Sequence, residues 1–147
     1  MPCPLCNGKT KEGRPCRHKT CKYAPKCMHH TQVQVKASNI AGRGLFAKEA
    51  LRKNVVFADY TVGTDALGAT QFQARYPDGK ATHVWKHPRG PYYDALNASK
   101  SVAGMANRAP RNQRNNAKIT GGGKLKTTRA VRKGEELTVG YGAAFRL

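Results

Sequence analysis

The stretch TTRAVRKGEELTVGYGAAFRL, residues 127–147, joins a strand-like beginning to two adjacent glutamates and a tyrosine between two glycines. The β-branched residues of KLKTTRAV, residues 124–131, predict a strand that runs into this stretch. We interpret Glu135 and Glu136 as a turn and a structural ion pair, and assign them no catalytic role. A buried tyrosine is most often a packing residue with a hydrogen-bonded hydroxyl. The role of Tyr141 therefore depends on the rest of the chain.

The series Thr-x-Arg-x-Val-x-x-Gly-Glu-Glu-Leu-Thr-x-x-Tyr-Gly in this stretch resembles the closing motif of the SET-domain protein lysine methyltransferases. GRGLFAKEALRKNVVFADYTVG, residues 42–63, is similar to the first motif of that family, and YYDALNASKSVAGMANRAPRNQRNNAKI, residues 92–119, to its middle motif. The three motifs follow one another in the expected order and cover most of residues 33–143. The resemblance implies an S-adenosylmethionine-dependent protein-lysine N-methyltransferase that acts on histone lysine.

Gly42 and Gly44 lie one residue apart, which allows positive φ and a close approach of a ligand to the backbone. The resemblance implies that this turn lies against the methionine part of S-adenosylmethionine, with Arg43 and Leu45 as neighbouring cofactor contacts. A side chain at either glycine is then expected to obstruct the cofactor and to strain the turn.

The resemblance also implies cofactor contacts from the middle and closing motifs. Asn107 matches the asparagine that binds the amino-acid end of the cofactor. Arg108 replaces the usual histidine, so only its backbone contact to the adenine carries over. Asn116 matches the second asparagine, which supports the threaded, knot-like site. Phe145 is expected to cover the cofactor. Alternatively, the protein forms a homodimer in which the second subunit covers it.

Tyr141 matches the catalytic tyrosine of the family, and the resemblance also places it among the cofactor contacts. Tyr60 matches a channel tyrosine at the end of the first motif, and we count it with Tyr141 as a catalytic candidate. Val139 stands two residues before the catalytic tyrosine, a position that often limits how many methyl groups fit. Valine is small and has no hydroxyl, so the resemblance implies a roomy channel and a di- or trimethyl product. Tyr92 or Tyr93 could fill the same space and keep the product at one methyl.

Residues 1–30 hold all five cysteines and three of the five histidines, with few large aliphatic side chains. Such a segment cannot bury enough apolar surface to fold unaided. A structural zinc ion can supply about 10–16 kcal/mol to a module of this kind. The strongest tetrahedral set is Cys6, Cys16, Cys27 and His30, whose spacing resembles a short Cys-Cys-Cys-His module of large DNA viruses.

Two rival ligand sets remain open. Cys3 and Cys6 could form a knuckle that pairs with Cys27 and His30. Alternatively, Cys16, Cys21, Cys27 and His30 loosely resemble an RNA-binding finger.

The chain is expected to be mostly β and to contain two parts: a zinc-binding module over residues 1–32 and a SET domain over residues 33–147. VQVKAS and VVFADYTV predict strands, because the first alternates and the second is β-branched and aromatic. We expect irregular connections from residue 63 to residue 123, where Gly, Pro and Asn recur. The expected SET domain has small sheets and a knot-like C-terminal threading.

A formal net charge of +19 over 147 residues predicts a polyanionic or acidic partner, such as DNA or a nucleosome. We expect a histone or another basic protein as the substrate. No apolar run has membrane-spanning length, so we expect no membrane contact and an intracellular, nuclear location, with packaging in a virion as an open alternative. A zinc-containing chromatin-binding protein with an inactive SET-like domain is the alternative function.

Overall fold

The computed structural model describes residues 5–18, 22–97 and 101–140 of the chain. Short strands dominate it, as the sequence predicts. The elements are β1 (Val33–Ala37), β2 (Arg43–Ala47), β3 (Val56–Asp59), β4 (Asp65–Leu67), α1 (Ala69–Arg75), β5 (Val84–Lys86), β6 (Tyr92–Asp94), the 3-10 turn η1 (Ala103–Met105), β7 (Ala117–Ile119), β8 (Lys124–Thr127), β9 (Glu136–Leu137) and β10 (Val139–Gly140).

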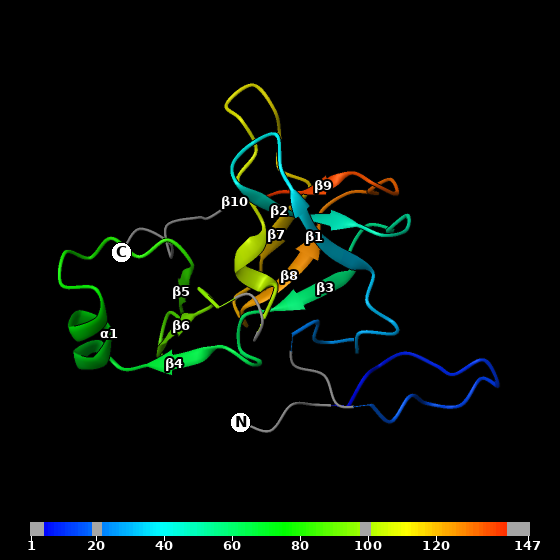
Figure 1. Ribbon diagram of the computed structural model, residues 1–147, viewed down its shortest axis with the longest axis horizontal. Coiled ribbons are helices and arrows are strands. Elements are labelled where there is room, and N and C mark those ends of the chain that lie inside the picture. Colours follow the sequence, from blue (N-terminus) through cyan, green and yellow to red (C-terminus); the bar gives the residue numbers. More distant parts are fainter. Residues whose placement is uncertain (1–4, 19–21, 98–100, 141–147) are drawn as a thin grey trace.

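The strands form three small sheets (Figure 1). One has the order β1-β2-β9 and is antiparallel throughout. A second has the order β10-β7-β8-β3, in which only the β10–β7 pair is parallel. The third has the order β4-β6-β5 and lies with α1 to one side of the molecule (Figure 1). The closing segment thus contributes one strand to each of the first two sheets and links them.

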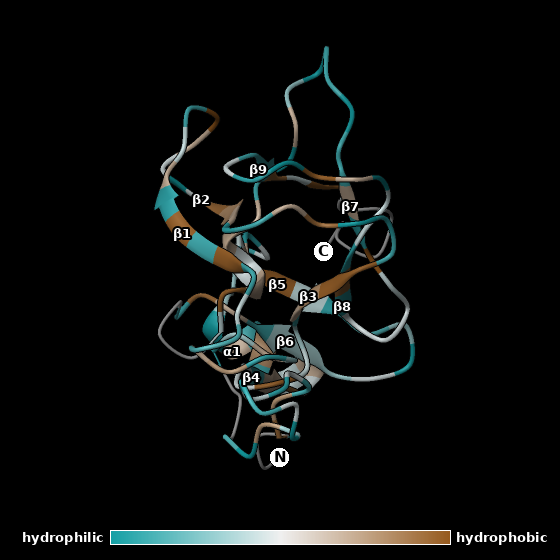
Figure 2. Ribbon diagram, turned by 90° about the vertical axis from the view of Figure 1, so that its right-hand side faces the viewer, coloured by the Kyte–Doolittle hydropathy of each residue, from teal (hydrophilic) through white to brown (hydrophobic). Residues whose placement is uncertain are grey.

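One apolar core joins the first two sheets and reaches the third. Alternation places Val33 of β1 and Leu125 of β8 inside, both with no exposed surface, while Lys124 faces outward. Figure 2 shows the same alternation as brown and teal bands along β1. The remaining large and fully buried apolar residues of this core include Leu45, Tyr60, Val102, Leu137 and Val139.

The three predicted strands are confirmed as β1, β3 and β8, although β3 and β8 are shorter than their sequence patterns. The expectation of irregular connections over residues 63–123 is wrong for much of that region, which contains α1 and the third sheet. Strands of three residues show no readable period in the sequence. They are stabilised instead by a separate apolar cluster, in which Phe72 of α1 stacks on Tyr92 with ring centroids 4.1 Å apart.

The cysteine-rich segment contacts the main core and the residue that precedes η1. Tyr23 contacts the core, and the Val102 N–H donates to the Lys22 carbonyl at 2.9 Å. Across residues 5–18, 22–97 and 101–140, every helix is too short and too polar to cross a lipid bilayer.

Candidate metal centre and cofactor site

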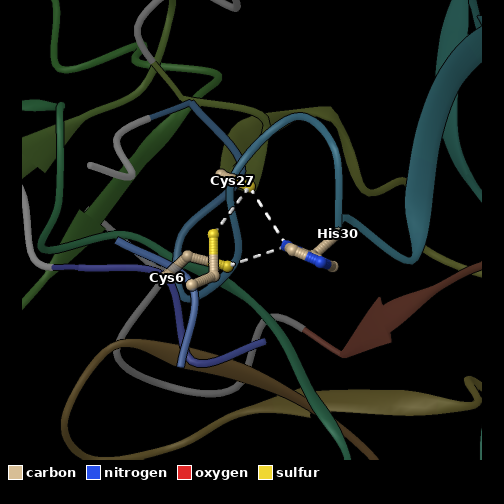
Figure 3. A group of neighbouring side chains, drawn as sticks. Cys6, Cys27 and His30 are labelled. Carbon is tan, nitrogen blue, oxygen red and sulfur yellow. Dashed lines mark hydrogen bonds between the residues drawn. The ribbon is translucent and has the colours of Figure 1, made fainter. Parts of the chain in front are cut away.

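Four side chains from the cysteine-rich segment converge on one point. The ligand atoms of Cys6, Cys16, Cys27 and His30 all lie within 4.8 Å of one another. Figure 3 shows Cys6, Cys27 and His30 turned toward this point. The Sγ atoms of Cys16 and Cys27 are 3.9 Å apart, and His30 Nδ1 lies 3.4 Å from Cys27 Sγ.

These separations suit a tetrahedral zinc ion. Sulfur ligands at about 2.3 Å and nitrogen ligands at about 2.0–2.1 Å from a tetrahedral zinc lie roughly 3.5–3.8 Å from one another. Cys6 Sγ and His30 Nδ1, at 3.6 Å, fall in that range. Three sulfurs and one nitrogen are also the donor types that zinc prefers. The residues therefore fit the metal, and among the described residues the chain brings together the ligand set predicted first.

The backbone around the cluster is shaped for this convergence. The Cys6 N–H donates to the His18 carbonyl and the Cys16 N–H to the Gly8 carbonyl, which joins the two sides of a tight loop. Gly8 is required at its position, because a Cβ there would lie 2.7 Å from Cγ of His30.

The electrostatics of the cluster favour a thiolate at Cys6. Burial disfavours the charged form, but hydrogen bonds from the backbone of Cys27 and Gly8 outweigh it and lower the pKa of the Cys6 thiol to about 7. At Cys16, the His18 backbone hydrogen bond lowers the pKa, yet burial and the two other cysteines raise it above its ordinary value. A bound cation would favour all three thiolates. Cys3 and Cys21, the alternates of the rival sets, lie outside the described residues.

A second candidate site is a hollow of about 390 Å³ at the end of the β1–β2 turn. This volume is within the usual range for small-molecule pockets. The hollow is lined by Ala41, Gly42, Arg43, His83, Gly104, Met105 and Asn107. The hollow therefore brings together part of the Gly-x-Gly turn and Asn107 of the middle motif.

Asn107 ties this site together through its amide nitrogen. Nδ2 donates to the carbonyl oxygens of Ala41 at 3.1 Å and Arg43 at 3.2 Å, on either side of Gly42. The same nitrogen lies 2.9 Å from a carboxylate oxygen of Glu136 and 3.2 Å from Ser38 Oγ. The asparagine thus connects the opening, middle and closing motifs.

The two glycines of the turn have different roles. Gly42 has φ of +44°, a conformation that side chains rarely adopt, and a Cβ there would meet no protein atom within 4 Å. A Cβ on Gly44 would instead lie 2.4 Å from Oε2 of Glu136. A side chain at the second glycine would therefore displace the Glu136 carboxylate, with or without a cofactor.

Asn116 lies at the junction between the two main sheets and is almost fully buried. Its Nδ2 donates to the Glu136 carbonyl at 2.8 Å, and its Oδ1 accepts from the Thr138 N–H at 2.8 Å. Next to it, the Val139 N–H donates to the Asn107 carbonyl at 2.9 Å. Both predicted asparagines therefore hold the closing segment in place.

Of the predicted channel residues, three share the main core and one does not. Tyr60 and Val139 have no exposed surface, and Tyr93 packs against the same cluster. The Trp85 ring contacts both of these tyrosines, with its centroid 6.4 Å from that of Tyr60 and 5.8 Å from that of Tyr93. Tyr92 faces the opposite side of β6 and packs in the smaller cluster.

The remaining predicted cofactor contacts divide between the described and undescribed parts of the chain. Leu45 is fully buried in the core and does not line the hollow, and Arg108 is exposed beside Asn107. Tyr141 and Phe145 lie outside the described residues.

The two adjacent glutamates, Glu135 and Glu136, have different roles. Glu135 forms an ion pair with Arg129 at 2.7 Å, which confirms the structural ion pair. Glu136 accepts hydrogen bonds from Ser38 and Asn107 and belongs to the site. The sequence reasoning missed Ser38, Glu136, His83 and Met105, because none of them has a signal of its own without the tertiary contacts. Burial also lowers the pKa of His83, despite the opposing effect of Asp94.

Comparison with known proteins adds no family assignment. No protein-family model matches this sequence, and no curated protein matches it either.

Proposed function

We propose that the protein is an S-adenosylmethionine-dependent lysine N-methyltransferase of the SET type that acts on histone lysine. The observation that carries the proposal is the convergence of its three motif-like segments on Asn107, which lines the hollow. Asn107 bonds to residues 66 and 64 positions earlier, Ala41 and Arg43, and to Glu136, 29 positions later. The segments that carry the resemblance therefore meet at one residue, which supports the proposal.

The hollow fits an amino-acid-like ligand in its residue types. Gly42 leaves the backbone open toward it, Arg43 supplies a cation for a carboxylate, and Met105 supplies apolar surface. When bound, S-adenosylmethionine supplies an activated methyl group. In the proposal, Asn107 keeps the Ala41–Arg43 turn in one conformation, so that the binding surface is preformed.

The protein must also deliver the lysine as a neutral amine. A lysine of pKa ~10.4 loses its proton near pH 7 at a cost of about 4.6 kcal/mol, at ~1.36 kcal/mol per pH unit. An apolar channel lowers this cost because it disfavours the ammonium ion. We propose that Tyr60 and Val139 belong to the channel wall and that Tyr141 orients the amine, so that catalysis rests mainly on alignment and preorganised electrostatics.

Calorimetric titration of the full chain with S-adenosylmethionine tests this proposal before any activity assay. We expect one binding site per chain. Asn107→Ala should weaken binding by about tenfold or more, because it removes hydrogen bonds that hold the turn, at about 1 kcal/mol or more each. Asn112→Ala, an exposed asparagine in the loop 108–116, is the matched control and should leave the affinity unchanged. Absence of heat in the wild-type titration would reject the proposal.

We further propose that the cysteine-rich cluster holds one structural zinc ion. Four protein ligands leave no open coordination position, which is typical of structural rather than catalytic zinc. The ion would stabilise the segment that packs against Val102 and the core. Elemental analysis of protein purified without chelator should find one zinc per chain, and a metal-free, folded protein would contradict the assignment.

A further inference from the structure

Two loops that are distant in the sequence form one strongly basic surface. The loop of residues 48–55 connects β2 to β3, and the loop of residues 128–135 connects β8 to β9. They extend side by side at the right of Figure 1. Their exposed cations are Lys48, Arg52, Lys53, Arg129, Arg132 and Lys133. We call these two loops the basic loop pair.

Backbone hydrogen bonds hold the basic loop pair in a fixed arrangement. Leu51 and Val131 exchange two of them, each 2.8 Å long, and both side chains are buried. The Asn54 N–H donates to the Thr127 carbonyl at 2.9 Å, and the Gly134 N–H donates to the Ala47 carbonyl at 2.8 Å. The cations therefore project from a preorganised base, which lowers the entropic cost of binding a partner.

Acidic residues compensate this surface poorly. Glu49 and Glu135 are the acids of the two loops, and Glu135 is occupied by Arg129. Six cations against two acids leave four positive charges. The neighbouring strands add to them, since Lys118 of β7 stands directly opposite Lys126 of β8. Like charges in opposed positions destabilise a sheet, so an anionic partner would relieve that repulsion.

The chemistry of the surface favours phosphate over protein as the partner. The large hydrophobic side chains that are exposed among the described residues are Leu5, Met28, Ile40 and Leu96, and none belongs to the basic loop pair. Protein interfaces depend on apolar or aromatic anchors at their centre. Binding to a phosphate backbone requires cations and the release of counterions. We propose that the basic loop pair binds the phosphate backbone of duplex DNA.

This activity is separate from methyl transfer. The basic loop pair shares no residue with the hollow at Asn107, so DNA binding should not require S-adenosylmethionine. It would hold the protein on a nucleosome while the hollow and its channel act on a histone lysine.

Salt-dependent binding to a short fluorescent duplex tests the inference. Because Arg129 is paired with Glu135, about five cations can contact phosphates, and wild-type affinity should fall roughly five-hundredfold between ~50 and ~200 mM salt. Arg132→Gln/Lys133→Gln should reduce the slope of log affinity against log salt by about two, close to one per cation removed. Lys80→Gln/Arg89→Gln removes the same charge from exposed turns near the third sheet and should leave the slope unchanged. Thermal unfolding should be alike in both variants.

Several results would overturn the proposal. Absence of duplex binding by the wild type would do so directly. An equal decrease of the salt slope in the two double variants would show that binding depends on the total charge of the protein and not on the basic loop pair. Loss confined to Arg111→Gln/Arg114→Gln would assign binding to the loop 108–116 instead. Retained duplex binding by Arg132→Gln/Lys133→Gln, with loss of binding to an acidic polypeptide such as poly-glutamate, would identify an acidic protein as the partner.

Discussion

Replacement of Gly44 by alanine tests the contact that joins β2 to β9. The new Cβ would lie 2.4 Å from Oε2 and 2.9 Å from Cδ of Glu136, and 3.1 Å from Nδ2 of Asn107. Real Cβ atoms do not approach other atoms to 2.4 Å, so the carboxylate must withdraw. Because β2 and β9 pair directly, with Leu45 opposite Leu137, the backbone cannot separate without further loss.

The cost follows from the hydrogen bonds that the carboxylate makes. Glu136 accepts from Ser38 Oγ at 2.8 and 2.9 Å and from Asn107 Nδ2 at 2.9 Å. Hydrogen bonds to a charged group contribute about 1.5–3 kcal/mol each, and the partial exposure of Glu136 favours the lower figure. Loss of both donors should therefore lower the free energy of unfolding by about 3 kcal/mol.

Urea unfolding, followed by the fluorescence of the single tryptophan, Trp85, measures this change. Trp85 is buried in the main core and should respond to its loss. A change of about 3 kcal/mol lowers the urea midpoint by roughly 1–3 M, at an m-value of ~1–3 kcal/mol/M. Gly121→Ala is the control, because a Cβ at Gly121 meets nothing within 4 Å and its φ is not positive.

The decisive comparison is the same substitution in a Glu136→Ala background. Without the carboxylate, the added methyl group has room, so Gly44→Ala should cost far less there than in the wild type. An equal cost in both backgrounds would refute the close-contact argument. A wild-type cost no larger than that of Gly121→Ala would refute it as well.

Four further predictions concern the metal, the chemistry and the acid response. Cys27→Ser should release the zinc and destabilise the cysteine-rich segment, as measured by elemental analysis and limited proteolysis; retained zinc would reject this ligand set. Tyr141→Phe should slow methyl transfer to a histone peptide by about ten- to a thousandfold with little change in cofactor affinity, as steady-state kinetics and calorimetry would show, and a wild-type rate would reject the catalytic role. Small Val139 should allow a di- or trimethyl product, and mass spectrometry that finds one methyl after long incubation would contradict it. Burial opposes ionisation of Asp94, yet hydrogen bonds from Tyr76, the Leu96 N–H and Arg75 lower its pKa. Its stabilising effect should thus be present above the ordinary pKa of ~3.9 and vanish as pH falls through the folded-state pKa, so wild type and Asp94→Asn should converge in acid unfolding curves.

Local pattern was sufficient for several features of this protein. Alternation in VQVKAS and β-branching in KLKTTRAV determine β1 and β8, because a half-buried strand needs only its own period of two. The scarcity of large aliphatic residues near the N-terminus predicts a metal in place of a core, and the spacing of cysteines and histidine indicated Cys6, Cys16, Cys27 and His30.

Tertiary structure alone decided the features that depend on distant segments. Three-residue strands such as β5 carry too few side chains for a period, so the third sheet exists only through partners in β6 and α1. In the sequence alone, nothing distinguishes Glu136 from an ordinary acidic residue in a turn. The pairing of β2 with β9 places it beside Asn107. The basic loop pair likewise depends on the mutual hydrogen bonds of Leu51 and Val131, 80 residues apart in numbering. Hydrogen bonds and charge clusters between such distant residues depend on how close the residues lie in space. The separation of two residues along the chain does not determine that distance.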